Sequence, residues 1–242
     1  MNSIYKRFGG LMLFSVLFMA CEDDETANTS SITFYPEFEV TGASSLQIGI
    51  NDDYVEPGIL ATEQGAQIDV SVSYTGRFTG FSGTEIPNTA DQYTVNYSAL
   101  NVDGFAGSAS RTVFKIDNGD FVSSIAGLYS STVVRSTGVT YSDILVLVWE
   151  TAPNVYEISS YIGGYYGEGS GFGDGYLARG GTITVNDIAT NDFTFGQAQF
   201  PIWGNVVDIT SMTVDPATKT ISYSTLADFG GMWDITMTQV EL

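Results

Sequence analysis

Short stretches of alternating apolar and polar residues recur along this chain, and Gly, Asn, Asp or Ser residues separate most of them. Alternation with a period of two is the pattern of a β-strand that buries one face. Tyr93, Val95 and Tyr97, for example, fall on one face of such a stretch. A second stretch, 67–74, places Val72 in its inward set. Because no long segment shows the helical period, the pattern predicts an all-β protein.

The spacing of these stretches predicts two domains. Those in residues 31–118 are spaced as in a β-sandwich. A turn-rich joint at 117–120 separates them from residues 121–242, where a run of sequential strands indicates an antiparallel β-barrel or a strongly curved sheet. The last predicted strand, 233–240, is expected to pair with the first strand of this second domain, 127–134.

The first residues have the layout of an export signal. In residues 1–20, Lys6 and Arg7 precede an apolar run that is much shorter than the about 20 residues needed to span a bilayer. Cys21 follows as the only cysteine of the chain, and the residues before it resemble the bacterial lipobox. The resemblance implies cleavage of the signal peptide and acylation of Cys21, which would anchor the protein to a membrane. A plain secretory peptide is the alternative.

Four acidic residues, 22–25, come directly after the cysteine and begin a polar tether over 21–30. They resemble the acidic export signal of Bacteroidetes lipoproteins that face outward from the outer membrane. The resemblance implies a cell-surface location. A simple solvated tether is an alternative that is compatible with it.

Charge and composition exclude several functions. The chain has 28 acidic and 8 basic residues, and this balance argues against nucleic acid as a partner. It has no histidine, which removes histidine-dependent triads, histidine bases and the usual zinc sites. A hydrolase that uses two carboxylates remains open, but no motif singles out such a pair. We therefore expect a protein that is not an enzyme.

Three stretches of the first domain resemble the bacterial immunoglobulin-like repeat. They are 54–58, 91–97 and 103–107, where the repeat reads Y-x-D-P-G, G-x-Y-x-V-x-Y and D-x-x-G-N. Glu56 and Asp91 depart from it. The resemblance implies an immunoglobulin-like β-sandwich, a domain that commonly serves as a spacer.

Residues 161–181 stand out chemically, since nine glycines alternate there with aromatic and charged residues. Three interpretations are open: a loop that plugs the end of the second domain, a platform whose rings stack on a glycan or peptide, or a calcium site. The calcium site would use Glu168, Asp174 and backbone carbonyls, although the spacing matches no known calcium loop. No other cofactor is expected. The candidate ligand-binding residues are Tyr165, Tyr166, Glu168, Phe172, Asp174, Tyr176 and Trp203.

Together these features resemble small surface lipoproteins of Bacteroidetes that accompany TonB-dependent transporters and their SusD-like lids. The resemblance implies an accessory subunit of a SusC/SusD-like nutrient-uptake complex that binds a glycan or peptide without chemistry. A purely structural subunit that packs against the transporter is the alternative, and a carboxylate-based hydrolase is a further one.

Overall fold

The computed structural model describes residues 32–242. The predicted signal peptide over 1–20, the lipidated Cys21 and the tether over 21–30 lie outside the described residues and stay predictions. Within the described part, no helix is long and apolar enough to cross a membrane. Strands make up nearly all of the regular structure, which confirms the all-β prediction.

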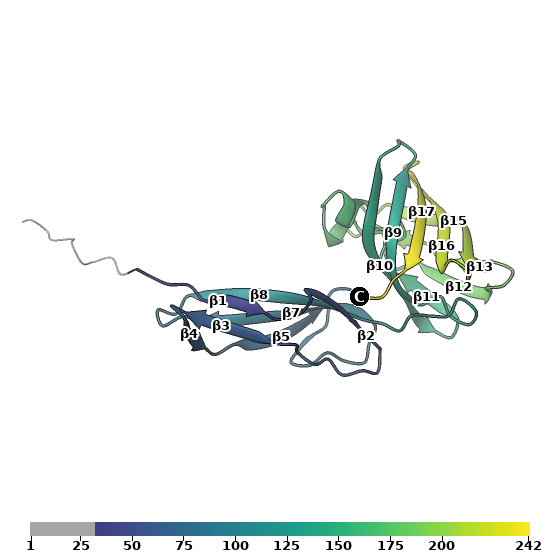
Figure 1. The fold of residues 1–242 in the computed structure, drawn as a ribbon. Helices are drawn as coiled ribbons and strands as arrows, with labels where there is room; N and C mark the ends of the chain where they lie inside the picture. Colours follow the sequence, from purple (N-terminus) through teal and green to yellow (C-terminus); the bar gives the residue numbers. More distant parts are fainter. Residues whose placement is uncertain (1–31) are drawn as a thin grey trace, which may run out of the picture. The chain divides into compact units, whose positions relative to one another are not determined.

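The first domain is a sandwich of two sheets (Figure 1). The smaller sheet has the order β1-β3-β4 and contains β1 (Glu37–Val40), β3 (Ile59–Glu63) and β4 (Ala66–Ile68). The larger sheet has the order β2-β8-β7-β5-β6 and contains β2 (Ser45–Ile48), β5 (Ser71–Gly76), β6 (Ser82–Gly83), β7 (Asp91–Leu100) and β8 (Ala106–Lys115). Tyr93, Val95 and Tyr97 on β7 form the buried centre between the sheets. The predicted immunoglobulin-like fold is confirmed.

One strand prediction in this domain is wrong. The stretch 67–74 is not one strand, because β4 ends at Ile68 and β5 begins at Ser71 in the other sheet. The chain crosses between the two sheets at this point, so a single alternating face cannot continue through it. Val72 is consequently 37% exposed rather than inward.

The second domain is one antiparallel sheet of nine strands with the order β13-β12-β11-β10-β9-β17-β16-β15-β14. The strands are β9 (Gly127–Arg135), β10 (Thr140–Ala152), β11 (Val155–Ile158), β12 (Thr182–Asp187), β13 (Asp192–Phe195), β14 (Ala198–Gln199), β15 (Val206–Asp215), β16 (Thr220–Ala227) and β17 (Met232–Gln239). The last strand pairs with the first strand of the domain, as predicted. The sheet ends at β13 and β14, which follow each other in the chain but do not pair, so it is a strongly curved half-barrel.

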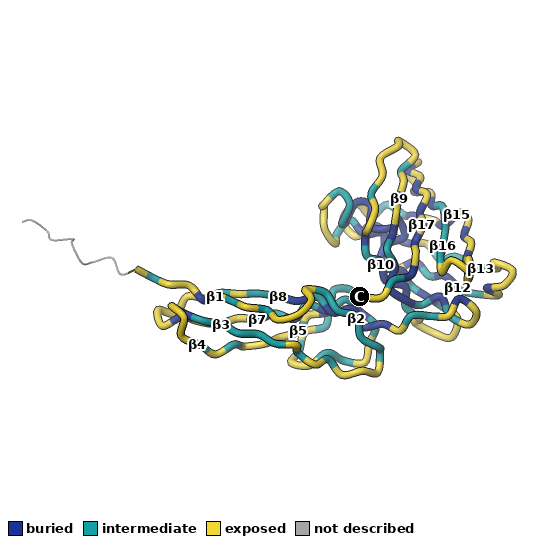
Figure 2. The backbone as a smooth tube through the Cα atoms, in the orientation of Figure 1, coloured by how far each residue is buried: buried dark blue, intermediate teal, exposed yellow. Residues whose placement is uncertain are grey.

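The inner face of this sheet is apolar and closely packed, and Figure 2 shows buried stretches along its strands. Buried residues alternate with exposed ones along β17, so that Trp233, Ile235 and Met237 point inward. The segment between β11 and β12 completes the core, since Tyr161 and Ile162 are fully buried among the inward side chains. The segment therefore fills the concave side of the sheet, as the plug interpretation predicts.

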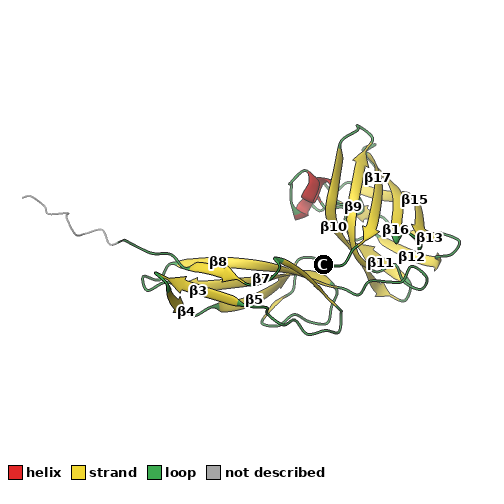
Figure 3. Ribbon diagram, viewed as in Figure 1, coloured by secondary structure: helices red, strands yellow, loops and turns green. Residues whose placement is uncertain are grey.

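Two short helical turns interrupt this segment, and Figure 3 shows helix in red beside β10. They are a π-turn, η1 (Tyr165–Gly169), and a 3₁₀-turn, η2 (Asp174–Tyr176). Gly163 precedes them with φ +58°, and a Cβ there would lie 2.7 Å from the Ser131 hydroxyl oxygen and 2.9 Å from Ile235 Cγ2. Both the backbone conformation and the close packing thus require glycine at this position.

Residues 35–242 form one compact unit, in which an apolar cluster joins the two domains. Its buried members are Phe114 and Ile116 from the end of the first domain and Leu128 and Leu147 from β9 and β10. Asn118 lies in the connection, donates a hydrogen bond to the Val240 carbonyl (2.8 Å) and accepts one from the Leu128 amide (3.0 Å). The side chain of Asn118 thus ties the connection to both β9 and the C-terminal end of the chain.

Candidate ligand-binding surface

The structure divides the predicted site residues into three groups. Phe172, Tyr176 and Trp203 lie at the surface of the second domain, where they form what we call the aromatic patch. Tyr165 and Tyr166 are buried beneath it, 4% and 9% exposed. The two carboxylates, Glu168 and Asp174, contact the first domain instead and are described after the aromatic residues.

The rings of the aromatic patch contact one another directly. The ring of Tyr176 lies 4.9 Å from that of Trp203 and 5.3 Å from that of Phe172, in edge-to-face arrangements. Phe172 is 53% exposed and Trp203 is 42% exposed. Exposed aromatic rings in mutual contact offer flat apolar faces to a ligand, and their packing holds them in place.

Tyr166 connects the aromatic patch to the core. Its ring stacks on Phe172 at 5.9 Å with an interplanar angle of 6°, and it meets the edge of Trp203 at 5.0 Å. On the other side it contacts Trp233 at 5.9 Å. Burial raises the pKa of the Tyr166 hydroxyl. Tyr166 is therefore an uncharged ring that supports Phe172 and Trp203 from below.

Tyr165 faces inward. Its ring lies 5.0 Å from that of Tyr141 and 6.1 Å from that of Trp233. Its face is therefore covered by protein in this structure. Tyr165 supports the platform, whereas the sequence pattern included it among the stacking residues.

Several members of the surface were not identified from the sequence. Phe229, 45% exposed, lies in the turn between β16 and β17 and contacts Trp233 at 6.1 Å. Arg135, at the end of β9, places its guanidinium carbon 5.8 Å from the ring centres of both Tyr166 and Trp233. The positions of these residues depend on strand pairing, since Arg135 lies opposite Trp233 in the β9–β17 ladder. No local motif would have found them.

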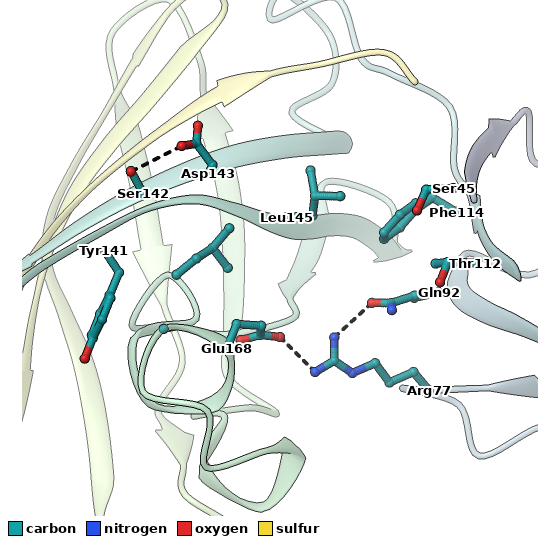
Figure 4. A pocket seen from close by; sticks show the side chains of 12 residues that line it. Ser45, Arg77, Gln92, Thr112, Phe114, Tyr141, Ser142, Asp143, Leu145 and Glu168 are labelled. Carbon is teal, nitrogen blue, oxygen red and sulfur yellow. Dashed lines mark hydrogen bonds and ion pairs between the residues drawn. The ribbon is translucent and has the colours of Figure 1, made fainter. Parts of the chain in front are cut away.

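The carboxylates of the segment bind an arginine of the first domain, and Figure 4 shows the ion pair between Glu168 and Arg77. Arg77 donates from Nη2 to Glu168 Oε1 at 2.8 Å and to Asp174 Oδ1 at 2.5 Å, and from Nε to Asp174 Oδ1 at 3.0 Å. A further bond from its Nη1 to Gln92 Oε1, 2.9 Å, fixes the guanidinium. Glu168 and Asp174 are thus joined to the first domain and not directed at the aromatic patch.

Burial and charge act differently on these two carboxyl groups. Burial raises the pKa of Glu168, and the nearby Arg77 guanidinium only partly opposes this shift. The hydrogen bond from Arg77 lowers the pKa of Asp174, whose side chain is 50% exposed. The positive charge between the Glu168 and Asp174 carboxylates is therefore the guanidinium of Arg77. In residues 32–242, no three carboxylate, cysteine or histidine side chains gather where they could hold a metal ion.

A cavity of about 500 Å³ opens beside this ion pair. Figure 4 shows Arg77 and Gln92 on one side of it, and Glu168 and Tyr141 on the other. Its lining carries no exposed ring cluster comparable to the aromatic patch. The aromatic patch is therefore the stronger candidate for a ligand-binding surface.

Comparison with known proteins supports the two-domain organisation. Residues 38–114 match the family of bacterial surface protein Ig-like domains. Residues 118–239, half of the chain, match a family described as a "-like, C-terminal domain". A search of curated proteins found no match.

Among solved structures, the lipoprotein BT2262 from Bacteroides thetaiotaomicron is similar, with 25% sequence identity and a TM-score of 0.64. The similarity covers 85% of this chain and 100% of that chain. The chain therefore belongs to the family defined by this C-terminal domain, which follows a bacterial surface Ig-like domain.

Proposed function

We propose that this chain is a non-catalytic surface lipoprotein that captures a glycan or peptide on the aromatic patch of its second domain. In this proposal it is anchored in the outer membrane through Cys21 and serves as an accessory subunit of a TonB-dependent SusC/SusD-type uptake complex. The first domain acts as a spacer between the lipid and the binding surface.

Two observations support a location at the bacterial surface. The first domain belongs to a family of bacterial surface proteins, and a structurally similar protein is a Bacteroides lipoprotein. The lipobox-like residues before Cys21 and the acidic residues after it fit such a location.

The observation that carries the binding proposal is the contact of two exposed rings, Phe172 and Trp203, with the half-buried ring of Tyr176 between them. Isolated exposed apolar residues are common on proteins, whereas a cluster of rings fixed by mutual contact marks an interaction surface. Sugar rings present C–H faces that pack on such rings, and peptides present apolar side chains. Each stacked ring contributes about 1 kcal/mol, so capture of one ligand unit is weak and improves with several units.

The test compares the full-length protein in detergent with a variant in which Phe172 and Trp203 are replaced by alanine. Binding is measured on an array of plant, mucin and microbial oligosaccharides and short peptides, followed by titration calorimetry of the hits. Loss of two rings at about 1 kcal/mol each should weaken binding roughly 30-fold. Phe105→Ala is the matched control, because Phe105 is a 48% exposed aromatic residue of the first domain.

Three outcomes would contradict the proposal. Equal weakening by Phe105→Ala would show that the effect is not specific to the aromatic patch. Unchanged array binding, together with lost co-purification with a transporter from solubilised membranes, would favour a purely structural subunit. Shortened oligosaccharides or peptides after incubation would show that the protein is a hydrolase.

A further inference from the structure

Arg135 is a cation without a counterion at the edge of the aromatic patch. Its guanidinium lies over the rings of Tyr166 and Trp233 at 5.8 Å from each. No carboxylate of residues 32–242 forms an ion pair with it, and none of its guanidinium nitrogens has a hydrogen-bond partner there. Rings stabilise a cation without occupying its N–H donors. The donors of Arg135 are therefore available to another group.

The neighbouring strands add two more polar atoms without partners. Arg135 on β9, Trp233 on β17 and Thr225 on β16 lie directly opposite one another in the ladder and share the inner face. Trp233 and Thr225 are each 1% exposed, yet the Trp233 Nε1 and the Thr225 hydroxyl have no hydrogen-bond partner, and neither has Arg135 Nε. Buried polar atoms are normally paired. A row of three unpaired ones in register indicates a place built to meet a polar group.

The other basic residues of the described chain differ from Arg135. Arg77 and Arg111 pair with carboxylates, and the Lys115 amine bonds to the Asp52 carbonyl and to Asn88. The guanidinium of Arg179 lies over the Phe78 ring at the junction between the domains, and its charge interacts with the nearby Asp174 carboxylate. Lys219 lies in the turn between β15 and β16, away from the aromatic patch. Within this part of the chain, Arg135 alone combines an unpaired guanidinium with a ring, Tyr166, that contacts the exposed Phe172 and Trp203.

We propose that Arg135 is a carboxylate-binding subsite of the aromatic patch, and that the captured ligand is an acidic oligosaccharide built from uronic acid units. This inference rests on the proposed function and names its ligand class. One ring, Tyr166, separates the guanidinium from both Phe172 and Trp203. A sugar unit can thus place its C–H face on an exposed ring while a carboxylate of the same or the adjacent unit meets Arg135.

Charge restricts where an acidic ligand can bind. The chain has a net charge of −20, so it repels anionic ligands at long range. An acidic ligand can bind only where a local cation is not already neutralised, and Arg135 meets this condition. Guanidinium binds carboxylate through two parallel N–H donors, a geometry that a neutral hydroxyl cannot reproduce.

The test uses full-length protein and paired probes: oligogalacturonate, oligoalginate and hyaluronan fragments, each with its carboxyl-reduced neutral form. Poly-glutamate of similar length is the peptide arm. Arg135→Gln is compared with Lys219→Gln, which changes the net charge equally at a distant turn. We expect the wild type to bind at least one acidic probe about tenfold more tightly than its reduced form. Arg135→Gln should bring this ratio close to one with the neutral probe unaffected, whereas Lys219→Gln should keep it.

The inference is overturned if no acidic probe binds better than its reduced form, or if the preference survives in Arg135→Gln. Tight binding of poly-glutamate alone would assign the subsite to an acidic peptide and overturn the glycan assignment. If neutral probes bind through Phe172 and Trp203 without any acid preference, the proposed function stands and only this inference fails. If Phe172→Ala and Trp203→Ala leave all binding unchanged, the proposed function fails as well.

Discussion

The two domains hold an inward-facing arginine in opposite ways. In the first domain, the Arg111 side chain is fully buried and bonds to the carbonyls of Thr41 and Ala43, the Tyr97 hydroxyl and Glu56. In the second domain, the guanidinium of Arg135 rests on two rings and has no oxygen partner among the described residues. A cation whose N–H groups are hydrogen-bonded within the protein therefore stabilises the fold, whereas a cation held only by aromatic rings keeps its N–H donors for a ligand.

In the second domain, side-chain packing takes the place of these hydrogen bonds around the arginine. Aromatic contacts connect the rings around Arg135, and buried residues of the segment between β11 and β12 pack on the inner face of the sheet. In the first domain, Glu56 accepts hydrogen bonds from the hydroxyls of both Tyr54 and Tyr97 besides its contact with Arg111. Hydrogen bonds thus hold the arginine in the first domain, and apolar contacts surround it in the second.

The largest expected effect separates the two arginines. Arg111→Met should lower the free energy of unfolding by about 3–5 kcal/mol, because it leaves Glu56 and two carbonyls without their cation. Arg135→Met removes no hydrogen bond and should change stability by less than about 1 kcal/mol. Urea unfolding followed by circular dichroism measures both, since all three tryptophans lie in the second domain and their fluorescence would not report on the first. Equal losses of stability in the two variants would contradict the difference between the two arginines.

The next effect tests whether packing organises the second domain. Gly163→Ala should lower the free energy of unfolding by about 2–3 kcal/mol, from left-handed strain and from overpacking against Ser131 and Ile235. Gly171→Ala is the matched control, because Gly171 has φ +72° but no atom within 4 Å of an added Cβ. It should lower stability by only about 1 kcal/mol. Similar losses for both variants, in thermal unfolding followed by tryptophan fluorescence, would mean that the segment is not closely packed.

A smaller effect compares two buried hydroxyls on the inner face. The Ser131 hydroxyl donates to the Gly163 carbonyl at 3.2 Å, whereas the Thr225 hydroxyl has no partner. Ser131→Ala should therefore lower stability by about 1 kcal/mol, while Thr225→Val should be neutral or slightly stabilising without ligand. Denaturant midpoints of the two variants measure the contrast. A clear loss on Thr225→Val would show that its hydroxyl is bonded in the free protein.

The smallest effect concerns the third arginine, Arg77, and its dependence on pH. The raised pKa of Glu168 means that the folded protein holds this proton more tightly, so its contribution to stability decreases as the pH rises through the ordinary glutamate range. The lowered pKa of Asp174 has the opposite sign, and its contribution is lost as the pH falls below the ordinary aspartate range.

Wild type should therefore lose stability relative to Glu168→Gln as the pH rises from about 4. It should gain stability relative to Asp174→Asn as the pH rises toward the ordinary aspartate range. Thermal melts across this pH range measure both differences. Differences of the same sign would contradict the assignment of burial to one carboxyl and ion pairing to the other.

Local features of the sequence predicted much of the fold. The alternation in β7 placed Tyr93, Val95 and Tyr97 correctly in the core, and the last strand pairs with β9 as expected. Alternation failed at residues 67–74, where the chain passes from one sheet to the other, because that crossing leaves no local mark. The exposed Trp203 was also expected, since it lies in a turn next to glycine.

By itself, the sequence determined that the chain is almost entirely β, with a sandwich followed by a barrel or strongly curved sheet that carries an aromatic, glycine-rich segment. Period-two alternation and turn residues are local properties, and the strands follow from them. Only the tertiary structure decided which residues of that segment face outward, and that Glu168 and Asp174 meet Arg77. It also brought Arg135, Thr225 and Trp233 into one row, because register between strands about 90 residues apart depends on the packing of the whole sheet.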